Sequence, residues 1–177
     1  MIAILIAFYI CIGTFAIIGA MRGWAKELLV IFSVILALAL ITIIETMMPS
    51  LGRAVTSDPK TNFWVRTGIL VVLAFFGYQS PKVPILNRTQ RVRDRLSDNL
   101  LGFFMGALSG YAIIGSLWWF LAQANYFPPY IFPPGNDPMG LAAQRMVQWL
   151  PPAFLLGSVN VYIAVVIAFI FVIIVIV

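Results

Sequence analysis

The chain has 177 residues, of which 62% are apolar and 10% are charged, whereas about 25% of an ordinary soluble domain is charged. Its 11 Lys and Arg and 6 Asp and Glu are too few to solvate the surface of a soluble fold. With no histidine and one cysteine, the chain lacks the commonest metal ligand, the commonest general base and any intrachain disulfide. The composition predicts an integral membrane protein that is not an enzyme.

An all-α bundle of about five transmembrane helices is predicted, because crossing about 30 Å of hydrocarbon takes roughly 20 apolar residues in a helix. The first run lacks the positively charged start of a secretory signal, so we expect it to be retained. The third run is the weakest, since it is short and carries Arg66, whose guanidinium would have to reach the interface. We predict a single membrane domain over residues 1–177. The expected spans are residues 1–20, 28–48, 63–79, 100–124 and 153–177.

One short amphipathic helix is expected to lie in the plane of the interface before the last span. Asp137 is a good N-cap and Pro138 a good first helical residue, which together open a helix over residues 138–150. Apolar residues recur on one face of this helix and polar residues on the other.

Upstream of that helix, Phe-Pro-Pro occurs twice in a stretch rich in aromatic residues, and paired prolines favour extended backbone. Such rings suit either the headgroup region or a groove on a partner protein. The candidate docking residues are Phe127, Tyr130, Phe132 and Trp149.

Lys and Arg are distributed unevenly between the two sides of the expected bundle. Residues 21–27 and 80–99 contribute seven of them, and the connections on the opposite side contribute four. The positive-inside rule then places the N-terminus outside and the C-terminus in the cytoplasm.

An arginine cluster within residues 80–99 has two interpretations: an anchor for topology, or a binding site for anionic lipid headgroups. Binding of nucleic acid is not expected, because no folded scaffold with stacking aromatic rings accompanies the cluster. Its members are Arg88, Arg91, Arg93 and Arg95.

Glu45 is the only carboxylate inside an expected span, and an ionisable group there is a candidate for proton or ion handling. No second acid is expected nearby to relay a proton, and Arg66 would lie toward the same face of the membrane. A structural ion pair between these two residues is therefore the favoured interpretation. A transport cavity would require Thr14 and Asn160 to converge on the pair.

A stripe of small residues marks the fourth span, where Gly102, Gly106 and Gly110 repeat every four residues. Such a stripe lets another helix approach closely, because helices in a bilayer associate through packing and hydrogen bonds. We expect the partner to be a helix of the same chain, with another subunit as the alternative.

Two short motifs resemble those of the colicin V production protein family of small bacterial inner-membrane proteins. The first is Arg22-Gly23 followed by Glu27, at the turn after the first span. The second is the segment 98–110, which begins with Asp98 and contains the glycine stripe.

The resemblance covers about residues 1–125. Asn99 and Ser109 stand where the family commonly has arginine, so the glycine spacing is the matching part of the second motif. The resemblance implies a location in the bacterial inner membrane and a link to peptide-toxin export and envelope functions, without an assigned reaction.

Two functions fit these observations. The favoured one is a non-enzymatic scaffold or accessory subunit packed against a larger membrane complex, including an energy-transducing complex of the light-harvesting, reaction-centre or respiratory kind. The alternative is a small transporter or export component of the colicin V production type. A third, lower-ranked idea is a lipid-handling protein that uses the arginine cluster.

The expected partners are other membrane proteins and anionic lipids, and a homo-oligomer is compatible with the sequence. No cofactor of its own is expected, because imidazole ligands are lacking. A quinone, carotenoid or lipid could bind at its surface.

Overall fold

The computed structural model describes residues 4–47, 58–79, 92–127, 133–156 and 159–176. Every regular element in these ranges is a helix, and this confirms the predicted all-helical membrane fold. The helices are α1 (Ile4–Arg22), α2 (Trp24–Met47), α4 (Pro59–Tyr78), α5 (Val92–Gln123), α6 (Pro138–Val147), α7 (Pro151–Leu155) and α8 (Val159–Ile176).

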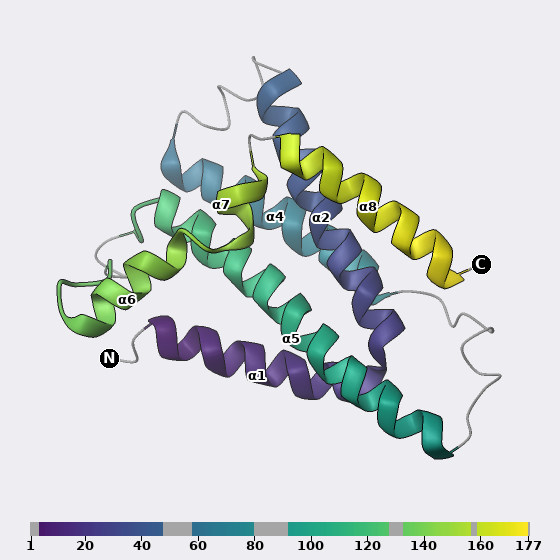
Figure 1. Cartoon of the computed structure of the whole chain (residues 1–177). Coiled ribbons are helices and arrows are strands. Elements are labelled where there is room, and N and C mark those ends of the chain that lie inside the picture. Colours follow the sequence, from purple (N-terminus) through teal and green to yellow (C-terminus); the bar gives the residue numbers. More distant parts are fainter. Residues whose placement is uncertain (1–3, 48–57, 80–91, 128–132, 157–158, 177) are drawn as a thin grey trace.

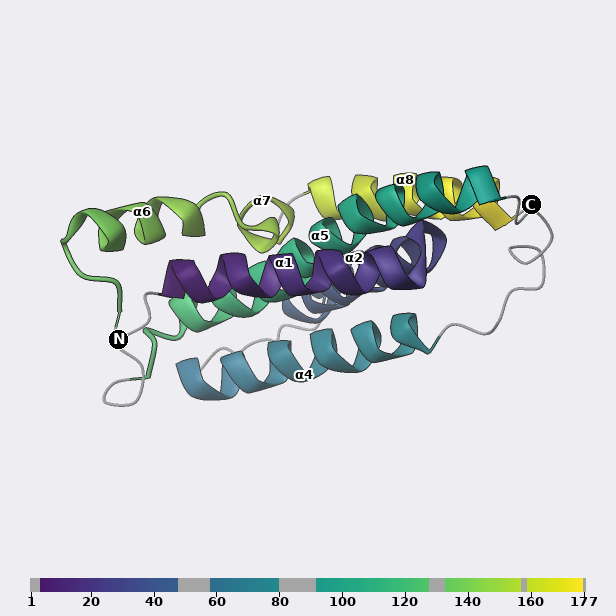
Figure 2. The ribbon, with the colours of Figure 1, turned by 90° about the horizontal axis from the view of Figure 1, so that it is seen from below.

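The long helices form an elongated bundle around α2 and α5 (Figure 1). Helix α1 packs along α5, while α2 contacts α4, α5 and α8. Figure 2 shows α4 on one side of α1 and α2, with α6, α7 and α8 on the other side. Helices α1 and α2 are joined by a single residue, Gly23, and diverge from that turn (Figure 1).

Four of the described helices are long and apolar enough to cross a membrane, namely α1, α2, α4 and the part of α5 from Ser97 to Gln123. The weak third span is a full helix of 20 residues, because Asp58 caps it and Pro59 fits its first turn. Arg66, the charged residue of this span, is paired with Glu45 of α2.

The expected last span, residues 153–177, is divided in the structure. Helix α6 ends at Val147, and the short α7 begins at Pro151. Proline disrupts the interior of a helix but fits its first turn. Pro151 and Pro152 therefore start a new helix. Helix α8 then runs from Val159, and the number of candidate spans becomes five when the bent pair of Pro138–Leu155 and Val159–Ile173, at 71°, counts as one.

The interior contains two clusters of buried side chains that share α5. The larger lies where α2 meets α4 and α5, and it includes Val34, Leu70 and Phe120. The smaller joins α1, α5 and the region of α6, and it includes Phe8 and Trp118. In a bilayer such contacts stabilise the fold mainly through close packing, since lipid offers the same side chains an apolar surrounding.

Helix α6 begins as predicted, because the Asp137 side chain accepts a hydrogen bond from the Gly140 backbone N–H. It buries a narrower face than expected. Gly140 and Ala143 are buried, whereas Met139 and Ala142 are exposed. The helix contacts α1 and α5 and so closes one end of the bundle.

Candidate functional site

The turn between α1 and α2 consists of a single residue, Gly23, with φ +88°. Its N–H donates to the Gly19 carbonyl at 2.9 Å, which ends α1 in the left-handed conformation that favours glycine. A Cβ added at Gly23 would lie 3.1 Å from a carboxylate oxygen of Asp98. The turn thus places the carboxylate of Asp98 beside the start of α2, whose dipole favours a negative charge.

Glu27 lies in the first turn of α2, and none of its surface is exposed. The Arg22 Nη1 donates to its Oε1 at 2.6 Å, and the Ser109 hydroxyl donates to its Oε2 at 2.7 Å. Both carboxylate oxygens therefore accept a hydrogen bond from the same chain. The first-turn position adds favourable interaction with the α2 dipole.

Arg22 connects this carboxylate to α4. Its Nη2 donates to the Tyr78 carbonyl at 3.3 Å, and its guanidinium lies 4.3 Å from the centroid of the Tyr78 ring. Through Arg22, Glu27, Tyr78 and Ser109, one polar cluster joins the ends of α1 and α4 to α2 and α5. We call these four residues the polar cluster.

The glycine stripe packs on α1 of the same chain. A Cβ at Gly102 would lie 2.5 Å from the Gly19 carbonyl oxygen, and one at Gly106 would lie 2.4 Å from the Phe15 carbonyl oxygen. A Cβ at Gly110 would lie 2.6 Å from the Cβ of Phe15. The two backbones are therefore in contact, and this close crossing carries α5 near enough to α2 for Ser109 to reach Glu27.

A second ion pair lies near the opposite end of α2. Glu45 Oε1 accepts from Arg66 Nε and lies 2.8 Å from its Nη2, which fastens α2 to α4. The Arg66 guanidinium also lies 5.5 Å from the Trp119 ring centroid. The ion pair expected from the sequence is thus present in the structure.

The other polar residues considered for a transport cavity do not converge on this pair. Thr14 donates to the Ile10 carbonyl in its own helix at 2.9 Å. Asn160 donates to the Phe154 carbonyl at 3.1 Å.

One interpretation of the sequence needs correction. Glu45 is not the only carboxylate inside a span, because α2 begins at Trp24 and includes Glu27, and the spanning part of α5 begins at Ser97 and includes Asp98. The charges around residue 27 indicated a turn, but the pairing with Arg22 lets the helix start earlier. Nothing in the sequence pattern pointed to Ser109 as the partner of Glu27, which is 82 positions away.

The arginine cluster and the docking residues are only partly covered. Arg88, Arg91, Tyr130 and Phe132 lie outside the described residues. Arg93 and Arg95 lie near the start of α5, where only the backbone is described.

The remaining docking residues behave differently from each other. Phe127 is half-buried and its ring meets Phe63 edge-on at 5.1 Å. Trp149 is 73% exposed, and its carbonyl accepts a hydrogen bond from the Tyr111 hydroxyl. Only Trp149 therefore presents an exposed ring among the docking residues that the structure describes.

The polar cluster is built to hold helices together. A carboxylate that accepts two hydrogen bonds and has no exposed surface offers no free oxygen to a substrate. Within the described ranges, no group of three His, Cys, Asp or Glu residues could hold a metal ion.

Comparison with known families extends this picture. The family model described as colicin V production protein matches residues 4–130, which is more than half of the chain. This range contains the polar cluster, Asp98 and the glycine stripe. No curated protein and no solved structure matches the chain.

Proposed function

The chain belongs to the colicin V production protein family, and from this premise we propose that it is a non-enzymatic scaffold or accessory subunit of a larger membrane complex. The observation that carries the proposal is the state of Glu27, which is fully buried and bonded to Arg22 and Ser109. A carboxylate that carries protons or acts in catalysis has to meet its substrate or proton source. Ion pairs that only hold helices together fit a rigid protein that binds its partners through its outer surface.

The outer surface of α4 is compatible with the same proposal. Its large apolar side chains on the side away from α2 are more than half exposed, as for Phe75 and Phe76. Large aromatic side chains are common at contacts between proteins, and in a bilayer they pack equally well against lipid or a neighbouring subunit. Energy-transducing complexes are among the candidates for this larger complex.

We place the protein in the bacterial inner membrane with its N-terminus outside. The charge count requires successive helices to end at alternate sides of the membrane, and three contacts support this order. Arg22 bonds to Tyr78 at the end of α4, and Gly23 lies beside Asp98 near the start of α5. The α1–α2 turn, the end of α4 and the start of the spanning part of α5 thus share one end of the bundle, while the Glu45–Arg66 pair marks the other.

The proposal is tested by extracting the native protein in a mild detergent, separating it on a native gel and identifying the co-migrating proteins by mass spectrometry. Stoichiometric co-migration with the subunits of one complex is expected, and their identity would name the process. Migration as a monomer or a homo-oligomer alone would contradict the proposal.

A second candidate is an export component, which the family's connection with colicin V production favours. Its charged site would be Glu45, whose side chain is 21% exposed and so remains accessible. Glu45→Gln should then abolish export of a peptide substrate measured in inverted vesicles. Unchanged export in this variant would remove Glu45 as the ionisable group of a transport cycle.

A further inference from the structure

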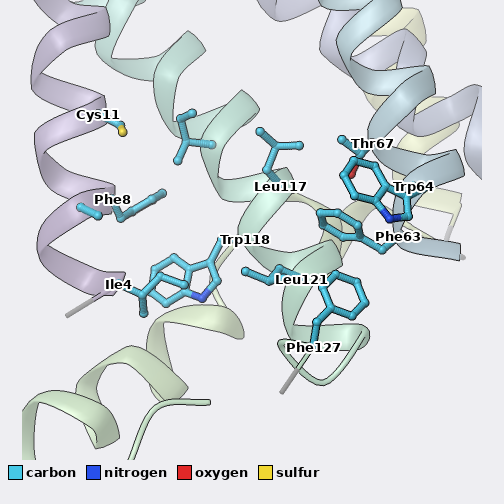
Figure 3. Close-up of a pocket in the computed structure, with 12 residues that line it drawn as sticks. Ile4, Phe8, Cys11, Phe63, Trp64, Thr67, Leu117, Trp118, Leu121 and Phe127 are labelled. Atoms are coloured by element: carbon cyan, nitrogen blue, oxygen red, sulfur yellow. The ribbon is translucent and has the colours of Figure 1, made fainter. Parts of the chain in front are cut away.

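Much of the surface that the described helices leave open is apolar, and lipid chains can cover it. An example is the cavity of about 470 Å³ between α1, α4 and α5, whose lining side chains are shown in Figure 3. The one hydroxyl in its wall belongs to Thr67, and its oxygen is buried out of reach of a ligand. Such a surface selects no partner, because hydrocarbon suits it as well as another helix does.

Asn160 places a polar group on the outside of the bundle. It lies in the first turn of α8, and it is exposed. Its Nδ2 donates to the Phe154 carbonyl at 3.1 Å, and this is the one hydrogen bond that the described structure gives to the side chain. An amide has two N–H donors and an accepting oxygen. Oδ1 and one N–H of Asn160 are therefore left to bond outside the described part of the chain.

The packing of α8 on α2 shows how deep this amide lies. The Phe169 ring lies 5.8 Å from the Phe32 ring of α2, and α8 runs from beside the far part of α2 back toward the α1–α2 turn (Figure 1). Asn160 precedes Phe169 by nine residues, about 13 Å, whereas α2 continues from Phe32 for about 22 Å to Met47. Asn160 thus lies about 9 Å short of that end of a spanning helix.

The neighbouring residue supports this depth. Val161 is fully buried and belongs to the larger cluster, together with Val34 and Leu70 from the middle of their helices. At such a depth there is no water to pair with an amide, and the ester carbonyls of lipids lie at the boundary of the hydrocarbon. An amide left half-paired there is costly. Another helix with a polar side chain at the same depth would remove the cost.

We infer that this face of α8 binds the same face of a second copy of the chain, in a two-fold dimer in which the two Asn160 amides pair. Each Oδ1 accepts an N–H from the other amide, so one residue type satisfies both sides of the contact. The exposed residues Ile163, Ile167 and Ile170 follow Asn160 on the same side of the helix and pack around the pair.

Two features favour a second copy as the occupant. All copies are inserted in one orientation, so two parallel α8 helices bring Asn160 opposite Asn160 at equal depth. Helix α8 also carries no charged side chain, so two identical faces meet without repulsion. The dimer does not rest on the proposed function, since a pair of copies can exist with or without a larger complex.

Cross-linking tests which face is paired. The full chain in a Cys11→Ser background is reconstituted at low density in phosphatidylcholine vesicles and oxidised with copper phenanthroline. Ile163→Cys should give a disulfide-linked dimer on a gel without reductant. Tyr162→Cys is the matched control, because Tyr162 is also exposed and lies at nearly the same depth, but about 200° around the helix from Asn160. It should remain a monomer.

Energy transfer between donor-labelled and acceptor-labelled copies, each labelled at Asn136→Cys in the same background, measures the association as lipid is added. Asn160→Leu should weaken association about tenfold, as expected for loss of a hydrogen-bonded pair between membrane helices. Asn160→Gln keeps the amide and should retain association.

A further pair of variants separates pairing from folding, because Asn160→Leu also removes the bond to Phe154. Ile163→Trp leaves the amide in place and adds bulk to an exposed position, so it should separate the helices and weaken association. Tyr162→Trp adds a similar ring on another side of the helix and should have no effect.

Four results would overturn the inference. The first is energy transfer no greater than that of randomly mixed monomers at every lipid dilution. The second is equal association of folded Asn160→Leu and the parent. The third is cross-linking of Tyr162→Cys as efficient as that of Ile163→Cys, which would place the contact on another face. The fourth is cross-linking of Ile163→Cys in native membranes to a different protein without any dimer, which would assign the face to that protein.

Discussion

Glu27 is the only charged side chain among the fully buried residues that the structure describes. A buried ion pair is stabilising only while both partners are satisfied, because removal of one leaves an uncompensated charge in an apolar surrounding. Arg22 would be left in that state if Glu27 were neutralised. It would keep its contacts with the Tyr78 carbonyl and ring.

We therefore predict that Glu27→Gln lowers the free energy of unfolding by about 3 kcal/mol. The measurement is thermal or denaturant unfolding in a mild detergent. Glu45→Gln is the matched control, since it removes the charge of a pair on the same helix whose carboxylate is 21% exposed. Its cost should be smaller than that of Glu27→Gln, because the Glu45 carboxylate is only partly buried. Equal costs for the two variants would contradict the role of burial.

Ser109 gives a second prediction at the same carboxylate. Ser109→Ala removes the hydrogen bond to Glu27 Oε2 without changing the glycine crossing. The buried Oε2 would lose the hydrogen bond from Ser109, at a cost of about 1 to 2 kcal/mol. Ser116→Ala is the control in the same unfolding assay, because its buried hydroxyl bonds only to the Ala112 carbonyl of its own helix. A smaller loss for Ser109→Ala than for Ser116→Ala would contradict this prediction.

At the level of single residues, the sequence identified one half of the polar cluster. Arg22, Gly23, Glu27 and Asp98 were indicated by their motifs, and the structure brings them together at one turn. Ser109 could not be found in this way, because a serine in a membrane helix usually bonds to its own backbone. Its link to Glu27 depends on how closely α5 approaches α2, which is a property of the assembled helices.

At the level of elements, α1 and α5 can cross in close contact because glycines, which have no side chain, lie at the crossing. A Cβ at Gly19 would lie 2.4 Å from the Gly102 carbonyl oxygen and 2.5 Å from the Cα of Gly106. Both atoms belong to a helix backbone and cannot move aside as a flexible side chain would. The helices would have to separate, with loss of contacts along their length.

We predict that Gly19→Ala destabilises the protein by about 2 to 3 kcal/mol in detergent unfolding, as expected for overpacking. Gly13→Ala is the matched control on the same helix, because a Cβ there meets nothing within 4 Å. Its stability should stay within about 1 kcal/mol of the parent or rise, since alanine is the better helix former. A loss for Gly13→Ala as large as that for Gly19→Ala would contradict the crossing.

The start of α4 gives a prediction about pH. Hydrogen bonds from the Thr61 N–H and hydroxyl hold the pKa of Asp58 below its usual range. A carboxylate with a lowered pKa stabilises the folded helix end above its ordinary pKa of about 4, and that contribution is lost as the pH falls through the lowered value. The protection of the first amides of α4 against hydrogen exchange, relative to an unfolded peptide at the same pH, should therefore fall below about pH 4, and Asp58→Asn should remove this pH dependence.

The elements themselves were largely predictable, because apolar length and caps are local properties. The expected third span became the complete helix α4 through the Asp58 cap and Pro59. The last span was harder, since residues 153–177 read as one apolar run while the structure starts α7 at Pro151 and α8 at Val159. Apolar composition alone does not reveal where a helix is interrupted.

At the level of the whole molecule, two ion pairs hold α2 near its two ends. Arg22–Glu27 ties it to α1 at one end, and Glu45–Arg66 ties it to α4 at the other. The helix ends therefore gather at two opposite ends of the bundle. These two ends differ in their charged residues. The proposed topology, in which the side with the α1–α2 turn faces the cytoplasm, rests on the count of Lys and Arg in the sequence and on the positive-inside rule.

This assignment predicts which positions a membrane-impermeant maleimide can reach in intact cells. Lys26 and Asn136 are both exposed and lie on opposite sides in this arrangement. In a Cys11→Ser background, Asn136→Cys should be labelled from outside, whereas Lys26→Cys should be labelled only after the membrane is permeabilised. Labelling of both in permeabilised cells is the control for reactivity. The reverse pattern in intact cells would mean that the seven cations lie outside, and that interactions other than loop charge set the orientation.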